Sequence, residues 1–169
     1  MIHCSVVCGG FACALVTNLR PNWSGNWAWG LPLIMVTVLI HALGLGLIRQ
    51  KTLNASSHAI RRHPTGVFVG VIGLTTLLAT TLHGIEAAIW AVAYRLLGAL
   101  PDFKSAMLYS LNAMTSYGHT SLALEEHWHL MGALEALNGW LLFGLSTAFL
   151  FAVIERVSSH VARRGHDDA

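Results

Sequence analysis

Ionisable side chains stand inside long apolar stretches of this sequence. His83 and Glu86 are three residues apart, so a helix places them on one face, where they can pair. Glu135 stands near the start of another apolar stretch. Such groups are costly to bury at membrane depth, and they mark either functional sites or buried polar contacts. Both interpretations stay open for His83 and Glu86, and we favour a buried polar pair that holds helices together.

The surroundings of Glu135 allow two roles equally. It can support a neighbouring loop by bonding Tyr117, Asn112 or a backbone amide, or it can simply pack between helices. His41 is the only ionisable residue of a third apolar stretch, and we expect it to be a satisfied interhelical residue.

The composition is that of a membrane protein. Of 169 residues, 54% are hydrophobic and 11% are charged, whereas a soluble domain carries about 25% charged residues. The formal net charge of +2 gives no reason to expect a nucleic-acid partner. Cys4, Cys8 and Cys13 share one apolar segment at roughly helical spacing. We expect them to be small apolar helix residues rather than a disulfide framework or a metal site.

Three runs are long and apolar enough to cross a bilayer, which takes about 20 residues as a helix. They are residues 29–48, residues 65–97 after Pro64, and residues 130–155. The composition of residues 20–28 indicates a loop with tryptophans at headgroup level. Residues 2–19 are apolar but short. We favour a membrane helix there, while a signal-like segment and a misassigned start stay open.

Basic residues predict the orientation of the spans. They gather in the linker after the first span, at Arg49, Lys51, Arg61 and Arg62, and after the last span, at Arg156, Arg163 and Arg164. By the positive-inside rule both regions are cytoplasmic. The span 65–97 therefore leaves the cytoplasm, the span 130–155 returns to it, and the segment between them enters from the outer side.

That segment is predicted to re-enter the membrane. Residues 102–115 form a short helix with Asp102 as its N-cap, too short to span, and residues 116–129 are irregular. Non-helical backbone at membrane depth is tolerated only where it is buried in protein or lines a water-filled cavity. A ring of such segments can replace the hydration shell of an ion with carbonyl oxygens. The carboxyl end of the short helix would favour a cation there.

The run from Gly98 to Ile154 resembles the bacterial two-helix pore-loop potassium channels. The matching pieces are GALPDF, AMLYSL and WHLMGALEALNGWLLFGLSTAFLFAVI, with HGIEAAIWAVAY and LIHALGL before them. The resemblance implies an all-α membrane protein with an outer helix, a re-entrant pore helix and filter, and an inner helix. One or two extra transmembrane helices precede them. It also implies a homotetramer in the bacterial inner membrane, surrounded by lipid, with K⁺ as the ion.

The sequence departs from this family at the filter. The family reads T-V-G-Y-G and then Asp, and a gapless match aligns Ser116, Tyr117, Gly118, His119 and Thr120 with the five filter positions. Thr120 replaces a glycine, although a β-branched residue resists positive φ. Tyr117 replaces a valine and is expected to overfill the packing behind the filter. We predict that Thr115 to Thr120 supply backbone and hydroxyl ligands, supported by Glu135 and Asn112.

Other residues near this mouth keep two interpretations. His119 can form a ring of imidazoles that binds a transition metal or responds to pH, or it can pack behind the filter, which we favour. The mouth also carries Glu125, Glu126, His127 and His129, which we expect to be solvated or interfacial groups that concentrate cations.

The last span contains residues that can shape an inner cavity. Gly139 and Gly144 permit bending, as an inner-helix hinge, or close packing. Ser146 and Thr147 either face the cavity or bond back to their own helix, and the sequence does not decide between these.

Four regions follow: an N-terminal hydrophobic segment and loop (1–25), a transmembrane helix and cytoplasmic linker (26–63), a pore domain (64–157) and a cytoplasmic tail (158–169). No nucleophile–base pair, metalloprotease motif or phosphate-binding loop occurs, so we expect no enzyme. We predict a channel subunit for monovalent cations, with no cofactor besides the permeant ion. The alternatives are a non-conducting scaffold or regulatory subunit, and a histidine-based proton or metal-ion pathway.

Overall fold

The computed structural model describes residues 23–59, 64–118 and 122–167, with side chains described for 23–51, 66, 68–118 and 122–159. Three long helices make up most of it: α2 (Trp23–Ala59), α3 (Pro64–Leu96) and α5 (His129–Asp167). Each contains a stretch long and apolar enough to cross a membrane, which confirms the three predicted spans. No strand occurs in the described ranges. The predicted N-terminal segment 2–19, with its cysteines, lies outside them.

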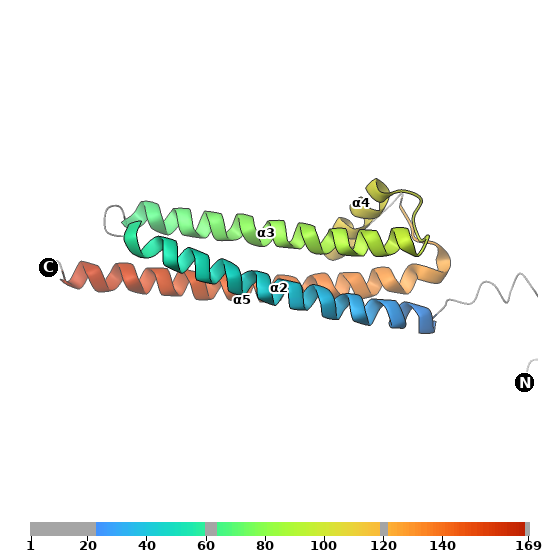
Figure 1. Ribbon diagram of the computed structural model, residues 1–169, viewed down its shortest axis with the longest axis horizontal. Coiled ribbons are helices and arrows are strands. Elements are labelled where there is room, and N and C mark those ends of the chain that lie inside the picture. The colour runs from blue at the N-terminus through green and yellow to red at the C-terminus, as the bar shows by residue number, and fades with distance from the viewer. Residues whose placement is uncertain (1–22, 60–63, 119–121, 168–169) are drawn as a thin grey trace, which may run out of the picture.

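The long helices lie side by side, as Figure 1 shows. α2 and α5 run in the same direction, because Asn26 contacts the start of α5 while His41 contacts Ser146 further along. α3 runs antiparallel to both of them. Arg49, Lys51 and Arg156 therefore lie at one end of the bundle, and the connection from α3 to α5 lies at the other.

Two predicted boundaries are wrong. Residues 23–28 are not a loop but the first turns of α2, and the predicted polar linker is helical as far as Ala59. The early start has a tertiary cause. Asn26 is fully buried, its amide nitrogen donates to the carbonyl of His127 at 2.6 Å, and its amide oxygen accepts from the Met131 backbone N–H at 3.0 Å. Asn26 thus satisfies one of the free amide groups that open α5.

The carboxyl ends of α2 and α5 extend further than predicted, and for a simpler reason. α5 continues to Asp167 rather than ending near residue 155, so the predicted pore-domain boundary at 157 falls inside a helix. Residues 49–59 and 156–164 contain neither proline nor glycine, and several of them are good helix formers. Pro64 begins α3 as predicted.

The connection between α3 and α5 contains the short helix α4 (Phe103–Met114) and the single 3₁₀ turn η1 (Glu126–Trp128). Asp102 is the N-cap of α4, as predicted. Its carboxylate accepts from the Ser105 backbone N–H at 2.9 Å and from the Ser105 hydroxyl at 2.7 Å. The backbone hydrogen bond from Ser105 has the largest effect on the pKa of Asp102 and the hydroxyl bond the next largest, and both hold this pKa below its usual range.

The carboxyl end of α4 lies deep against the bundle rather than at its rim. Met114 packs on Gly139 of α5, where an added Cβ would lie 2.7 Å from the Met114 Cα. Gly139 follows the first residue of α5 by ten positions, which is about 15 Å along a helix. Ser110 of α4 bonds the carbonyl of Ala87, about 14 Å before the end of α3. The contact with α5 and the contact with α3 therefore place α4 at the same depth in the bundle.

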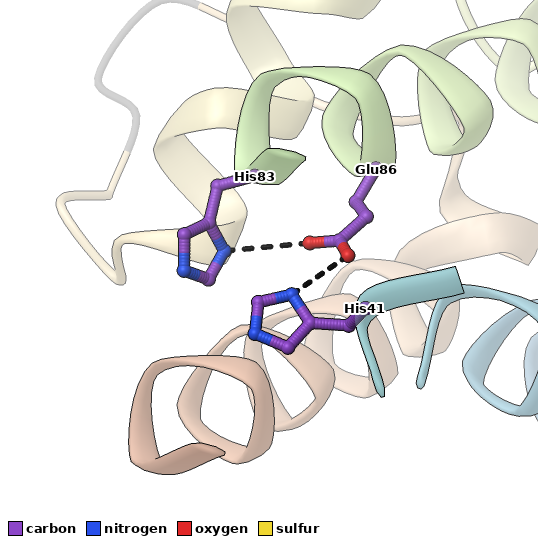
Figure 2. A group of neighbouring side chains, drawn as sticks. All are labelled: His41, His83 and Glu86. Carbon is purple, nitrogen blue, oxygen red and sulfur yellow. Dashed lines mark hydrogen bonds and ion pairs between the residues drawn. The ribbon is translucent and has the colours of Figure 1, made fainter. Parts of the chain in front are cut away.

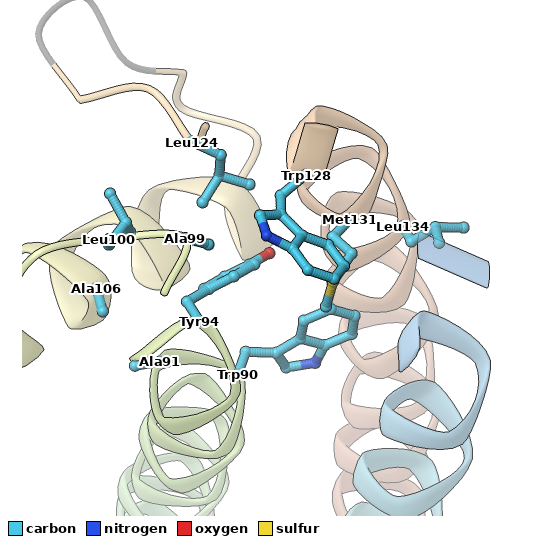
Figure 3. Packing of buried hydrophobic residues seen from close by; sticks show 10 residues of the cluster. All are labelled: Trp90, Ala91, Tyr94, Ala99, Leu100, Ala106, Leu124, Trp128, Met131 and Leu134. Carbon is cyan, nitrogen blue, oxygen red and sulfur yellow. The ribbon is translucent and has the colours of Figure 1, made fainter. Parts of the chain in front are cut away.

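A compact apolar cluster holds this end together. Figure 3 shows Trp90 and Tyr94 of α3 facing Trp128 and Met131, with Leu124 of the connecting segment closing the group. Tyr94 also packs edge-on against Tyr109 of α4, with ring centroids 5.4 Å apart. Elsewhere most large apolar side chains of the three long helices point outward, as expected for surfaces that face lipid or neighbouring subunits.

The contact between Gly139 and Met114 gives a direct test of the fold. In Gly139→Ala the new methyl group meets backbone, which cannot rotate away, so overpacking should cost about 1–3 kcal/mol. We expect thermal unfolding of the purified protein in detergent to shift several degrees lower.

Gly144→Ala is the matched control, because a Cβ there meets nothing within 4 Å in the chain. Its unfolding temperature should stay equal or rise slightly, since alanine is the better helix former. Equal unfolding temperatures for Gly139→Ala and wild type would contradict the close packing of α4 on α5.

Candidate functional site

The first residues of the predicted filter close α4 with a left-handed turn. Ser116 has φ +54°, its N–H donates to the Ala113 carbonyl at 3.0 Å, and the Tyr117 N–H donates to the Asn112 carbonyl at 3.0 Å. This pair of bonds is the Schellman pattern of a helix end. Gly118 follows with φ +83°, a conformation that suits glycine. His119 and Thr120 lie outside the described residues.

The hydroxyl groups of this turn are bonded within the chain. Thr115 donates its hydroxyl hydrogen back to the Leu111 carbonyl at 2.9 Å, and the Ser116 hydroxyl accepts from the Trp140 indole N–H of α5 at 2.9 Å. A hydroxyl that donates its hydrogen keeps its lone pairs, so the Thr115 oxygen can still accept or coordinate.

The prediction that Tyr117 overfills the packing behind the loop is wrong for the single chain. The Tyr117 side chain is 84% exposed and points away from that packing. Behind the loop lies an open pocket of about 350 Å³ instead, lined by Tyr109, Asn112, Ser116, Gly118, Leu122 and His129 among others. The predicted support residue Asn112 thus faces this pocket, and its carbonyl holds the Tyr117 amide.

Glu135 lies level with α4, as the loop-supporting interpretation requires, but its partners differ from those predicted. Neither Tyr117 nor Asn112 bonds its carboxylate. The Tyr94 hydroxyl of α3 donates to it at 2.6 Å, and the Ser110 hydroxyl of α4 is its second partner. Tyr94, Ser110 and Glu135 have no exposed surface. The carboxylate therefore joins α3, α4 and α5 directly beneath the loop.

The residues predicted at the outer mouth divide in two. Glu125, Glu126 and His127 are exposed at the approach to α5, in agreement with solvated groups. His129 is exposed as well, but its ring also bonds the Leu124 carbonyl at 2.8 Å through Nε2 and lines the pocket. It therefore helps to hold in place the irregular segment that precedes α5.

A second polar cluster lies nearer the middle of the bundle (Figure 2). The predicted pair is present, with His83 Nδ1 3.4 Å from Glu86 Oε2. The closer partner of Glu86 is His41 of α2, whose Nδ1 lies 2.8 Å from Oε1. Ser146 of α5 bonds both rings, at 3.0 Å from His41 Nε2 and 3.1 Å from His83 Nε2. Four side chains thus connect the three long helices.

The sequence predicted the pair of His83 and Glu86 but not the contacts of this pair with His41 and Ser146. The sequence did indicate a contact between His41 and Glu86. Both are ionisable residues in two consecutive apolar helices, and ionisable groups inside a membrane usually pair with one another. For Ser146 the structure shows neither predicted alternative, because its hydroxyl contacts both histidines. Thr147 bonds back to the Phe143 carbonyl of its own helix at 2.9 Å.

The two glycines and Asn138 of α5 serve different contacts. Gly139 permits close packing, while Gly144 has open space beside it. Asn138 donates to the Thr37 hydroxyl of α2 at 2.9 Å, in full burial. Together with Asn26 and His41, this bond forms a polar and small-residue seam of the kind that holds helices together in a membrane.

The buried carboxylate gives the second prediction. Tyr94→Phe removes one of the two hydroxyl groups bonded to Glu135 and leaves a buried carboxylate oxygen without its donor. A buried polar atom left without its partner costs about 1–3 kcal/mol, so unfolding in detergent should begin at a clearly lower temperature.

Tyr117→Phe removes the same atom from an exposed ring and should change stability by less than about 0.5 kcal/mol. If Tyr94→Phe and Tyr117→Phe unfold at the same temperature, the bond between Tyr94 and Glu135 does not hold α3 to α5.

The site was also compared with known proteins at the level of sequence and of structure. No family model matches the chain, and no match was found among curated proteins or among solved structures. The function is therefore argued from the residues and their geometry.

Proposed function

We propose that this chain is one subunit of a homotetrameric cation channel in a bacterial inner membrane, and that residues 115–120 line its narrowest part. The observation that carries the proposal is the depth of α4. This helix begins at the exposed Asp102 and ends at Met114, about 15 Å along α5, which is half of a hydrocarbon core about 30 Å thick. In the described parts of the return to α5, residues 115–118 and 122–125, the backbone is not helical.

Such a return needs water or protein beside it. Unpaired backbone groups facing lipid would cost several kcal/mol each, so irregular backbone at this depth implies a water-filled cavity or a protein neighbour. Tyr117 and Gly118 are exposed in the single chain, which leaves the loop uncovered. A ring of identical subunits would cover it and enclose a pore.

The charges of the region favour a cation. The carboxyl end of α4 carries the negative end of its helix dipole to the middle of the bundle. Glu125 and Glu126 add exposed negative groups where the loop returns to the surface. Both act in the same direction on an ion that enters from that side.

The orientation follows from the ends of the bundle. Arg49, Lys51 and Arg156 lie opposite the α4 end, so the positive-inside rule puts α4 on the outer side. Trp23, Trp27 and Trp29 are exposed at the α4 end, where tryptophans suit the outer membrane–water interface. Potassium is proposed as the ion on the resemblance described above.

Flux from proteoliposomes tests the proposal. Purified wild-type protein should pass K⁺, with Na⁺ and H⁺ measured in parallel. Gly118→Ala should reduce K⁺ flux at least tenfold, because alanine resists the φ of +83° at this position. Gly46→Ala is the matched control. Its Cβ meets nothing within 4 Å on α2, and its flux should equal that of wild type.

The outcomes separate the proposal from its rivals. Folded wild-type protein that passes no ion at any voltage or pH would replace the channel by a non-conducting pore-loop scaffold. Flux of H⁺ alone would favour a histidine-based proton pathway instead.

A further inference from the structure

We infer that His41, His83 and Glu86 form a binding site for a divalent transition-metal ion of the zinc class. The site lies within the helix bundle and is distinct from the proposed ion pathway. The three residues come from α2 and α3, and their ligand atoms all lie within 4.8 Å of one another. The side chains of His41 and Glu86 have no exposed surface, whereas the His83 side chain is 28% exposed.

The hydrogens of the cluster leave one contact between two acceptors. Two neutral imidazoles bring one N–H each, the Ser146 hydroxyl brings one O–H, and an ionised carboxylate brings none. These three hydrogens satisfy the three hydrogen bonds, from His41 to Glu86 and from each ring to Ser146. The His83 Nδ1 then turns a lone pair toward Glu86 Oε2, 3.4 Å away. A cation between these two atoms would replace their repulsion by attraction.

One carboxylate oxygen of the cluster is unpaired. Glu86 Oε2 is buried and has no hydrogen-bond partner, since its 3.4 Å approach to His83 Nδ1 is an ion-pair contact only. A buried carboxylate oxygen without a donor is costly. It is also the atom that a metal ion would use.

The spacing of the ligand atoms suits a metal ion. Around a tetrahedral zinc ion with bonds of about 2.0–2.1 Å, neighbouring ligand atoms lie about 3.3 Å apart. His83 Nδ1 and Glu86 Oε2 are already 3.4 Å apart, and His41 Nδ1 stands 2.8 Å from the other carboxylate oxygen. Two imidazoles and one carboxylate are a common ligand set for zinc and its neighbours, with a fourth position left open.

The orientation of the two rings also suits a metal ion. When both Nε2–H groups donate to the Ser146 hydroxyl oxygen, both Nδ1 atoms keep their lone pairs and direct them toward Glu86 (Figure 2). Metal-bound histidines in proteins are held in this way by a partner on the second ring nitrogen. Because Ser146 comes from α5, an ion here would connect all three long helices.

The experiment measures metal on the full-length protein, purified without a histidine tag and stripped with a chelator. After loading with Co²⁺ and desalting, we expect about one ion per chain by elemental analysis and the intense visible absorption of four-coordinate cobalt. Zn²⁺ should displace the absorption and raise the unfolding temperature of wild type. Ser146→Ala keeps all three ligands but frees both rings, so Co²⁺ affinity should fall about 10- to 100-fold.

Removal of a ligand should abolish the signal. His83→Ala alters the most exposed member of the cluster, and Glu86→Gln keeps the size of its side chain. Each should lose the cobalt absorption and the Zn²⁺ stabilisation. His127→Ala, which changes an exposed histidine outside the cluster, should keep both. The inference is overturned if wild type retains no metal, or if both ligand variants fold and bind Co²⁺ as wild type does.

Discussion

The carboxyl group of Glu135 is enclosed by three helices, and it is bonded to the Tyr94 hydroxyl of α3 and to the Ser110 hydroxyl of α4. These two bonds govern the whole α4 end of the molecule. If either hydroxyl moved away, a buried oxygen of Glu135 would be left without a partner, at a cost of about 1–3 kcal/mol. The short helix is therefore held at one depth and one rotation. The apolar cluster around Trp90 and Tyr94 fills the space that this bond defines.

The same rule explains how α2 is attached. In a membrane the apolar faces of helices gain little by leaving lipid, so association rests on close packing and on polar contacts. α2 supplies Asn26, Thr37 and His41 along one face, and each finds a partner on α5. Gly30 lies between the first two, where an added Cβ would come within 2.5 Å of Leu134. The extra helix is thus specified as tightly as the pore-forming part of the proposed channel.

Length, hydropathy and caps predicted the elements well, because those signals are local. The three spans, the start at Pro64 and the Asp102 cap depend only on nearby residues. What failed depends on tertiary contacts. Residues 23–28 look like a loop until Asn26 is seen to cap α5, and the partners of Glu135 depend on which hydroxyls rotate toward it. The contact between His41 and Glu86 was not predicted for the same reason, since hydropathy does not fix the rotation of α2 against α3.

The closure of α4 limits which atoms can hold an ion in the proposed channel. The carbonyls of Leu111, Asn112 and Ala113 accept N–H groups of residues 115–117, so three of the four terminal carbonyls are already engaged. The helix end can then act on a cation through its field but not as a set of ligands. Direct ligands must come from the backbone beyond Met114 and from hydroxyl oxygens such as that of Thr115, which donates its hydrogen to Leu111 and keeps its lone pairs. In the proposed channel, selectivity would therefore depend on how neighbouring subunits arrange residues 115–120, and the buried network around Glu135 fixes the position of the helix from which that loop starts.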